Sequence, residues 1–228
     1  MPPAEFTCWT MVRGAASGNP EDRDLFARKY TPVIRSYLEA RWRDSPLEGH
    51  VDDGVQEVFV ECFKEGGVLD CVEEIRLGSF RRFLHGVVRN VALRFEDQQA
   101  RAREGQAEDG YDFDAIARRE ETLSKLFDRA WARTVLDEAV AVQVDRAKSL
   151  GEAALRRVEL LHLRFHEGLP IREIARRWDA NPDVLHEQFR QARNEFRAAL
   201  FEVVAFENPG SAESIEREVE EIIAILTA

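Results

Sequence analysis

Apolar residues recur at intervals of three and four positions along most of this chain, and this spacing restricts its fold more than any other feature. It places apolar side chains on one face of an α-helix, where they can pack against a neighbouring helix. The clearest example covers residues 21–42, with the apolar positions Leu25, Phe26, Tyr30, Val33, Ile34, Tyr37, Leu38 and Trp42. Pro32 interrupts this segment and can open a second helix or kink the first. The chain is therefore predicted to be all-α.

Three further segments show the same spacing. One covers residues 51–63, and another begins at Phe80, directly after Ser79, whose hydroxyl suits a helix N-cap. A longer pattern runs over 115–148 and is interrupted at Gly151. We interpret this long helix as extra packing surface or as a brace.

Two small helical domains are expected, because 228 residues suffice for two compact units and residues 104–114 have the polar, glycine-containing composition of a linker. Four parts are predicted: a first domain over 22–103, a linker and long helix over 104–150, a second domain over 151–204, and an acidic amphipathic C-terminal helix over 211–228. That last helix could mask a basic surface of the chain, bind a regulator or cap the second domain.

The charge of the chain is unevenly distributed. A net charge of −11 opposes nucleic-acid binding over the whole surface, because phosphate contacts need Lys and Arg. Between residues 48 and 74 the charges are nearly all acidic, whereas 76–103 holds seven arginines against only Glu96 and Asp97. An acidic segment followed directly by a basic one predicts two different partners.

Several locations and classes of protein do not fit this sequence. No apolar run approaches the ~20 residues that span a bilayer, and the first residues lack the basic and apolar stretches of a secretory signal. Cys8, Cys62 and Cys71 show no Cys-x-x-Cys spacing, which argues against a disulfide framework and a structural zinc. We expect a cytoplasmic protein with reduced thiols and no membrane association.

The segment 168–193 is typical of a helix-turn-helix, with a plain helical hairpin as the alternative. Its first apolar face consists of Ile171, Ile174, Ala175 and Trp178, and its second of Leu185, Phe189, Ala192, Phe196 and Leu200. The turn between them is predicted over 179–182. Asp179 occupies the turn position where glycine is common, because φ is positive there.

Two segments of the first domain resemble a known family. They are Val51-Asp-Asp-Gly-Val-Gln-Glu-Val-Phe-Val60 and Gly78-Ser-Phe-Arg-Arg-Phe-Leu-His-Gly-Val-Val-Arg-Asn-Val-Ala-Leu93. Together with the order of the segments, they make the chain similar to the extracytoplasmic-function group of the sigma-70 family of bacterial RNA polymerase sigma factors. The resemblance covers roughly 22–103 and 153–200.

The resemblance implies two functional surfaces on the first domain. In that family an acidic helix docks on the clamp of core RNA polymerase, which here implicates Asp52, Asp53, Gln56 and Glu57. A second helix melts and reads the −10 element of promoter DNA. Asn90 falls on the family's asparagine, which helps to form a pocket for a flipped base. The residues implied to bind backbone phosphates are Arg81, Arg82, Arg89 and Arg94.

Phe80 accompanies these arginines in the sequence and could stack on a base or pack in the core. We expect Phe80 in the core.

The C-terminal helix-turn-helix of the family reads the −35 element. Outward residues near the start of its second helix would reach bases or phosphates, and here they include His186, Gln188, Arg190 and Arg193. Where the family usually has Val-Lys/Arg-Ser-Arg, this chain has Leu185-His186-Glu187-Gln188, which removes two cations and adds an anion. Attraction to phosphate should therefore be weak at this helix, and −35 binding unconventional.

No catalytic activity, cofactor or metal is expected. His162 and His166 lie four residues apart, but Glu167 follows the second histidine where the zinc-protease pattern needs a glutamate after the first. The sequence has no glycine-rich phosphate loop and no nucleophile elbow.

The function implied is promoter-specific transcription initiation, with core RNA polymerase, promoter DNA and a regulator such as an anti-sigma factor as partners. One alternative is a decoy that binds polymerase or a regulator without reading promoters. Another is a helix-turn-helix repressor, for which Asp53 and Gln56 would be unimportant.

Overall fold

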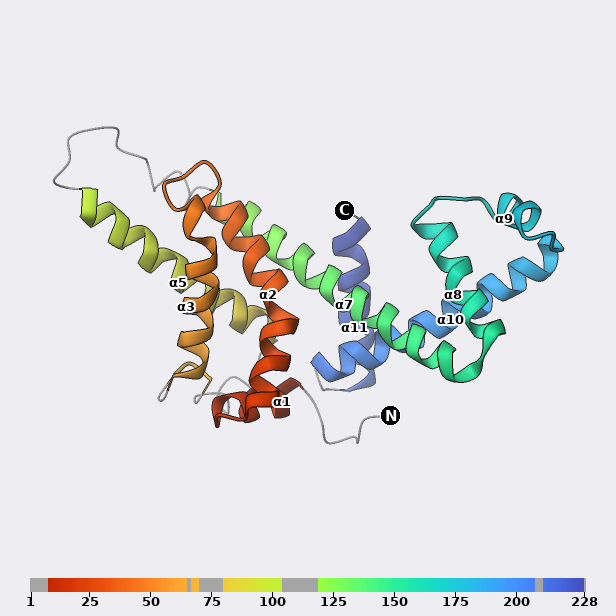
Figure 1. The fold of residues 1–228 in the computed structure, drawn as a ribbon, viewed down its shortest axis with the longest axis horizontal. Helices are drawn as coiled ribbons and strands as arrows, with labels where there is room; N and C mark the ends of the chain where they lie inside the picture. Colours follow the sequence, from red (N-terminus) through yellow and green to blue (C-terminus); the bar gives the residue numbers. More distant parts are fainter. Residues whose placement is uncertain (1–7, 65–66, 70–79, 104–118, 208–210, 228) are drawn as a thin grey trace. The chain divides into compact units, whose positions relative to one another are not determined.

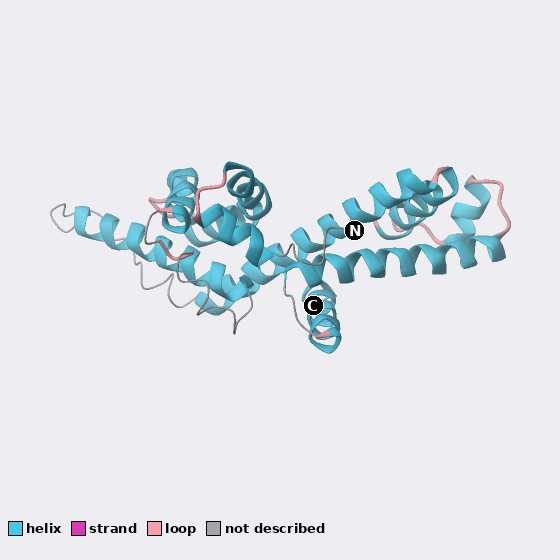
Figure 2. Ribbon diagram, turned by 90° about the horizontal axis from the view of Figure 1, so that it is seen from below, coloured by secondary structure: helices cyan, strands magenta, loops and turns pink. Residues whose placement is uncertain are grey.

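The computed structural model describes residues 8–64, 67–69, 80–103, 119–207 and 211–227, and the regular structure within them is helical (Figures 1 and 2). The elements are α1 (Cys8–Ala16), α2 (Pro20–Trp42), the short 3-10 helix η1 (Glu48–His50), α3 (Val51–Phe63), α5 (Phe80–Arg103), α7 (Glu120–Leu150), α8 (Glu152–Phe165), α9 (Ile171–Arg177), α10 (Pro182–Glu207) and α11 (Ala212–Thr227). The prediction of an all-α fold is confirmed. None of the described helices is both long enough and apolar enough to cross a membrane.

The chain divides into two compact units. The first unit contains Met1–Thr134, Phe206–Gly210 and Glu220–Ala228, and the second contains Val135–Ala205 and Ser211–Val219. Helix α7 thus contributes its first half to one unit and its second half to the other. The division falls inside a continuous helix, whereas the sequence suggested a boundary at 104–114, which lies outside the described residues.

Helix α2 begins at a well-formed N-cap. The Asn19 side chain accepts hydrogen bonds from the backbone N–H of Glu21, at 2.9 Å, and of Asp22, at 3.1 Å. Pro20 occupies the first turn, where its missing N–H costs nothing. The helix continues through Pro32 to Trp42, so this proline does not open a second helix.

The core of the first unit is rich in aromatic side chains. Tyr30 of α2 lies with its ring centroid 5.1 Å from Phe80 of α5 and 5.4 Å from Trp131 of α7. Phe26 approaches Tyr30 edge-on at 4.8 Å. All four side chains are buried, which confirms the expectation that Phe80 packs in the core.

The second unit is built around α8, α9 and the start of α10. Its buried cluster contains Leu160, Leu163, Ile171, Ile174, Ala175 and Leu185. Between α9 and α10, Asp179 has a φ of 47°, the left-handed conformation expected from its position in the predicted turn. The Asn181 side chain then accepts a hydrogen bond from the backbone N–H of Asp183, at 2.8 Å, and caps α10.

The strained turn leads to a prediction about stability. Asp179→Gly should raise the free energy of unfolding by about 0.5–1 kcal/mol, because glycine adopts a positive φ without the steric penalty of a Cβ. Urea denaturation followed by circular dichroism measures this change. Ala180→Gly, one residue further and without a positive φ, should instead destabilise the chain. Equal destabilisation by both substitutions would contradict the account of the turn.

Candidate nucleic-acid and polymerase interface

Helix α3 presents an acidic face to solvent. The side chains of Asp52 and Asp53 are 81% and 66% exposed, and Gln56 is exposed as well. The opposite face is buried and consists of Val51, Gly54, Val55, Val58 and Cys62. The buried and the exposed residues lie on opposite faces of one helix. Packing of the apolar face therefore determines that the acidic residues are the ones exposed to a binding partner.

Gly54 allows α3 to approach α2 closely. A Cβ at this position would lie 2.6 Å from Cη2 of the buried Trp42 ring and 3.0 Å from a methyl carbon of Leu38. No side chain larger than hydrogen fits there without movement of an aromatic core residue. The close packing therefore holds the acidic face in its orientation.

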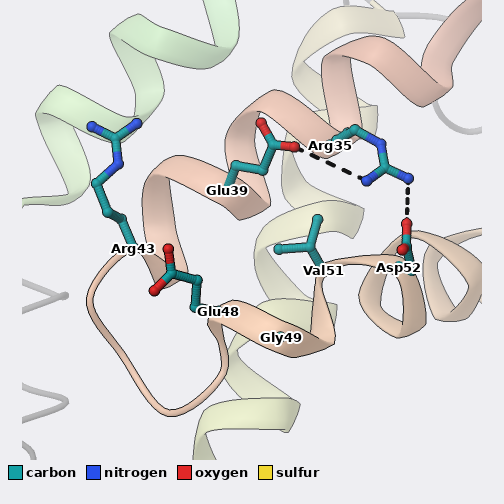
Figure 3. Close-up of a pocket in the computed structure, with 7 residues that line it drawn as sticks. All are labelled: Arg35, Glu39, Arg43, Glu48, Gly49, Val51 and Asp52. Carbon is teal, nitrogen blue, oxygen red and sulfur yellow. Dashed lines mark hydrogen bonds and ion pairs between the residues drawn. The ribbon is translucent and has the colours of Figure 1, made fainter.

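The exposed carboxylates of α3 already have neighbours within the chain. Asp52 forms an ion pair with Arg35 of α2, and the Asp53 carboxylate lies 3.1 Å from Nδ1 of His50. Figure 3 shows Arg35 between Asp52 and Glu39 at the edge of a depression of about 420 Å³. Its lining consists of Arg35, Glu39, Arg43, Glu48, Gly49, Val51 and Asp52. Cations and carboxylates are mixed there, so the depression favours no single ligand charge.

Glu57 is less exposed than the rest of the acidic face. Its side chain is partly buried and lies 3.9 Å from Nη2 of Arg94 on α5. Arg94 also donates a 2.9 Å hydrogen bond to Glu61, whose carboxylate accepts another from Lys64. These hydrogen bonds from Lys64 and Arg94 lower the pKa of Glu61 below its ordinary value. Arg94 thus joins α5 to α3.

Arg81, one of the residues implied to bind phosphate, is buried in the structure. Arg81 is only 7% exposed, and its guanidinium lies 3.6 Å from Asp128 of α7 and 3.5 Å from Glu221 of α11. The helical period explains this placement, because Arg81 precedes the buried Leu84 and Val88 by three and seven residues. Arg81 therefore serves packing within the first unit and does not line a surface.

Two other residues singled out on α5 are open to solvent. Arg82 and Asn90 are exposed, and they lie about two turns apart on the helix. Gly86 between them borders open space, since a Cβ there would meet no atom within 4 Å. Arg89 is 43% exposed, but its Nε lies 3.0 Å from a carboxylate oxygen of Glu120. Arg82 and Asn90 are the more accessible pair for a ligand.

A buried ionic network joins α2, α5 and α7, and it was not predicted from the sequence. Arg41 of α2 donates two parallel hydrogen bonds to Glu96 of α5, at 2.7 and 3.0 Å, and Trp42 donates a third to Glu96 at 3.1 Å. Arg41 also donates to Tyr37, at 3.0 Å, and to Glu120, at 2.9 Å. The sequence places Arg41 at the spacing of the inward face, after Tyr37 and Leu38, but it does not identify a partner.

Burial and charge have opposite effects on this network. Burial disfavours the charge of Arg41, but its acidic partners Glu96, Tyr37 and Glu120 together outweigh that effect, so the pKa of Arg41 is raised above its ordinary value. Burial raises the pKa of Tyr37 to about 12. At neutral pH the network therefore consists of a charged arginine, its carboxylate partners and a neutral phenol.

The start of α10 carries little net positive charge. His186, Arg190 and Arg193 are exposed, and Gln188 is partly buried. Glu187 accepts a 3.0 Å hydrogen bond from Nε of Arg190, which lowers the pKa of the Glu187 carboxyl. Arg190, which would meet a phosphate, is thus paired with a carboxylate about one turn away on the same helix. Weak attraction to phosphate at this helix stays a prediction.

Neither the histidines nor the cysteines form a metal site among the described residues, where no group of three or more His, Cys, Asp and Glu is suitably placed. The rings of His162 and His166 stack with centroids 4.7 Å apart. Cys8 and Cys62 are buried free thiols, and Cys71 lies outside the described residues.

Both buried thiols should be unreactive in the folded chain. Burial raises the pKa of Cys62 to about 12 and also raises that of Cys8, whose thiol donates a 2.8 Å hydrogen bond to the Glu207 carbonyl. Because the thiolate is the nucleophile, iodoacetamide at pH 8 should leave both unmodified until denaturant is added. Peptide mapping by mass spectrometry resolves each site. Rapid modification of Cys62 in the native chain would contradict its burial.

Comparison of the chain with protein-family models, with curated proteins and with solved structures finds no match.

Proposed function

We propose that this chain is a sigma factor of the extracytoplasmic-function type, which acts in the cytoplasm by binding core RNA polymerase and promoter DNA. One observation carries the proposal. Helices α3 and α5 pack together in the first unit, and they expose Asp53 and Gln56 on one helix and Arg82 and Asn90 on the other. The acidic segment thus exposes polar and acidic groups on α3, and the basic segment exposes Arg82 and Asn90 on α5, which suits two different partners.

The acidic face of α3 would bind the polymerase. Exposed carboxylates accept strong, directional hydrogen bonds from arginine side chains, and the amide of Gln56 can both donate and accept. Asp53 is the better candidate for the main contact, because Asp52 forms an ion pair with Arg35, whereas the Asp53 carboxylate contacts the exposed ring of His50. The backbone beneath is held by the close contact between Gly54 and Trp42.

The exposed face of α5 would stabilise the opened promoter. Asn90 has an amide that can pair with the edge of a flipped base, and Arg82 can neutralise a neighbouring phosphate. Unstacking one base costs a few kcal/mol, so a small number of such contacts is enough to shift the balance toward the open strands. The protein would thus act by binding alone, without a chemical step.

The second unit would contribute less to DNA affinity than its counterpart in other sigma factors. The Glu187–Arg190 pair leaves His186, Gln188 and Arg193 as the groups that can reach bases or phosphates. Because few phosphates are neutralised, affinity at the −35 position should depend only weakly on salt.

A decoy that binds polymerase without reading promoters is the second candidate function. The buried position of Arg81 and the carboxylate partners of Arg89 and Arg94 favour it, since they reduce the positive charge available to DNA. A decoy and a sigma factor share the α3 surface but differ in whether Asn90 matters. A repressor would differ from both, because it would not need Asp53.

Equilibrium binding to purified core polymerase tests the α3 surface. Asp53→Ala should weaken binding by on the order of tenfold, which corresponds to the loss of one charge-assisted hydrogen bond. The matched control is Asp24→Ala, which removes an exposed aspartate of α2 that pairs with Arg28, one turn away on the same helix. Unchanged binding of the Asp53 variant, or equal loss in both variants, would remove the polymerase from the proposal.

A further inference from the structure

Three of the four arginines implied to bind phosphate are covered by carboxylates of the same chain. Arg81 meets Asp128 and Glu221, Arg94 meets Glu57 and Glu61, and Arg89 meets Glu120. The partners come from α3, α7 and α11, so no single local repeat accounts for them. Of these arginines, Arg89 directly precedes the exposed Asn90 in α5.

Two residues of α2, Arg41 and Tyr37, hold the Glu120 carboxylate in place. One of its carboxylate oxygens accepts a 2.9 Å hydrogen bond from Nη1 of Arg41, and the other lies 3.3 Å from the Tyr37 hydroxyl. Arg41 is itself 1% exposed and fixed by its two hydrogen bonds to Glu96. The Glu120 carboxylate is therefore an anchored anion, whose position does not depend on Arg89.

The anchored carboxylate presents its charge to the outer arginine. The oxygen that faces the Tyr37 hydroxyl also lies 3.0 Å from Nε of Arg89, whose side chain is 43% exposed. A guanidinium whose Nε pairs with a fixed carboxylate has one donor engaged and part of its charge compensated. A DNA phosphate approaching Arg89 must either displace Glu120 or accept a weakened contact.

We infer that Glu120 acts as an internal phosphate mimic, which competes with the DNA backbone for Arg89 and restrains strand binding by the free chain. The inference rests on the proposed function, in which α5 binds the opened promoter, and on the phosphate-binding role that the family resemblance implies for Arg89. The first turn of α7 is then an autoinhibitory contact, and a partner that separates Glu120 from Arg89 would expose a phosphate-binding arginine next to Asn90.

Single-stranded DNA binding by the intact chain tests this inference. The probe is a fluorescein-labelled oligonucleotide of mixed sequence, followed by anisotropy at low salt without polymerase. Glu120→Gln keeps the shape of the side chain and removes its charge, so affinity should rise about five- to tenfold. The dependence of log affinity on log salt should steepen by about 0.7, the value for one additional phosphate contact on a single strand.

The chain offers a closely matched control. Glu121 is the next residue, is exposed, and pairs with Lys125 on its own helix. Glu121→Gln changes the net charge by the same amount, and its affinity should stay within about twofold of the unchanged chain. Equal gains for the two variants would mean that only the overall charge matters, and the inference would be wrong.

A double-mutant cycle with Arg89→Ala identifies the arginine involved. Arg89→Ala should change binding little in the unchanged chain, where Glu120 already occupies the guanidinium, and should abolish the gain in the Glu120→Gln chain. If Glu120→Gln unfolds the chain, Glu120→Asp takes its place. It keeps the charge but shortens the side chain, so the gain in DNA affinity should be smaller. A gain that survives the loss of Arg89, or no gain in any folded variant, overturns the inference.

Failure of this inference can be told apart from failure of the proposed function. If the unchanged chain directs initiation with core polymerase but Glu120→Gln binds single strands no more tightly, only the internal mimic is refuted. If Glu120→Gln gains affinity through Arg89 and no variant supports initiation, the mimic stands and the sigma-factor proposal is refuted.

Discussion

Glu96→Ala should lower the free energy of unfolding by about 3–5 kcal/mol, the loss typical of breaking a buried ion pair from one side. Glu96 accepts both hydrogen bonds of the Arg41 guanidinium and one from Trp42, and it is 5% exposed. Its removal leaves a buried cation with Glu120 as its remaining carboxylate partner. Urea denaturation monitored by circular dichroism and by tryptophan fluorescence measures the change.

Two controls separate charge burial from lost packing. Replacing Arg41 and Glu96 together, by methionine and leucine, should cost much less than the two single substitutions added, since no unpaired charge stays buried. Glu121→Ala removes an exposed ion pair and should leave the free energy of unfolding nearly unchanged. Additive losses for Arg41 and Glu96 would contradict a coupled network.

Gly54→Ala should lower the free energy of unfolding by about 1–3 kcal/mol, although alanine favours helices more than glycine does. The added methyl would meet the Trp42 ring at 2.6 Å in a core without spare room, so α3 must move away from α2. The same measurement on Gly86→Ala is the control. That glycine lies inside α5, and a methyl group there would meet no atom within 4 Å, so the substitution should be neutral or stabilising.

The two glycine variants also bear on function. Movement of α3 would displace Asp53 and Gln56 together, so Gly54→Ala should weaken polymerase binding even under conditions where the chain stays folded. A destabilised Gly54 variant with unchanged polymerase affinity would show that the orientation of α3 does not matter.

The helices and their buried faces could be predicted because they depend on local spacing. The apolar positions of α2 and α3 repeat within a single helix, and the turn at Asp179 follows from its distance to the small residue Ala175. These features need no knowledge of what lies across the core. The expectation that Phe80 is buried also came from its place in such a pattern.

The ionic contacts could not be predicted, because their partners lie far apart in the sequence. Arg41 and Glu96 are separated by 55 positions, and Arg41 and Glu120 by 79. A charged residue on an apolar stripe can extend to solvent or turn inward to a partner, and one sequence does not distinguish the two. The same ambiguity applies to Arg81, which is buried and lies against Asp128 of α7 and Glu221 of α11.

The division of the chain inside α7 was hidden for a different reason. Linkers are recognised from polar composition, but α7 is a continuous helix at Thr134 and Val135, where the unit changes. A helix whose packing partners change along its length keeps the same apolar spacing throughout. Its sequence therefore carries no mark of the boundary.

Run-off transcription with purified core polymerase on promoter-bearing genomic fragments tests the central claim most directly. The intact chain should support specific initiation, and Asp53→Ala and Asn90→Ala should each abolish most of it. Asp24→Ala and Gln98→Ala, exposed residues of α2 and α5, should leave it unchanged. Polymerase binding without initiation on any fragment would contradict the sigma-factor account and identify the chain as a decoy.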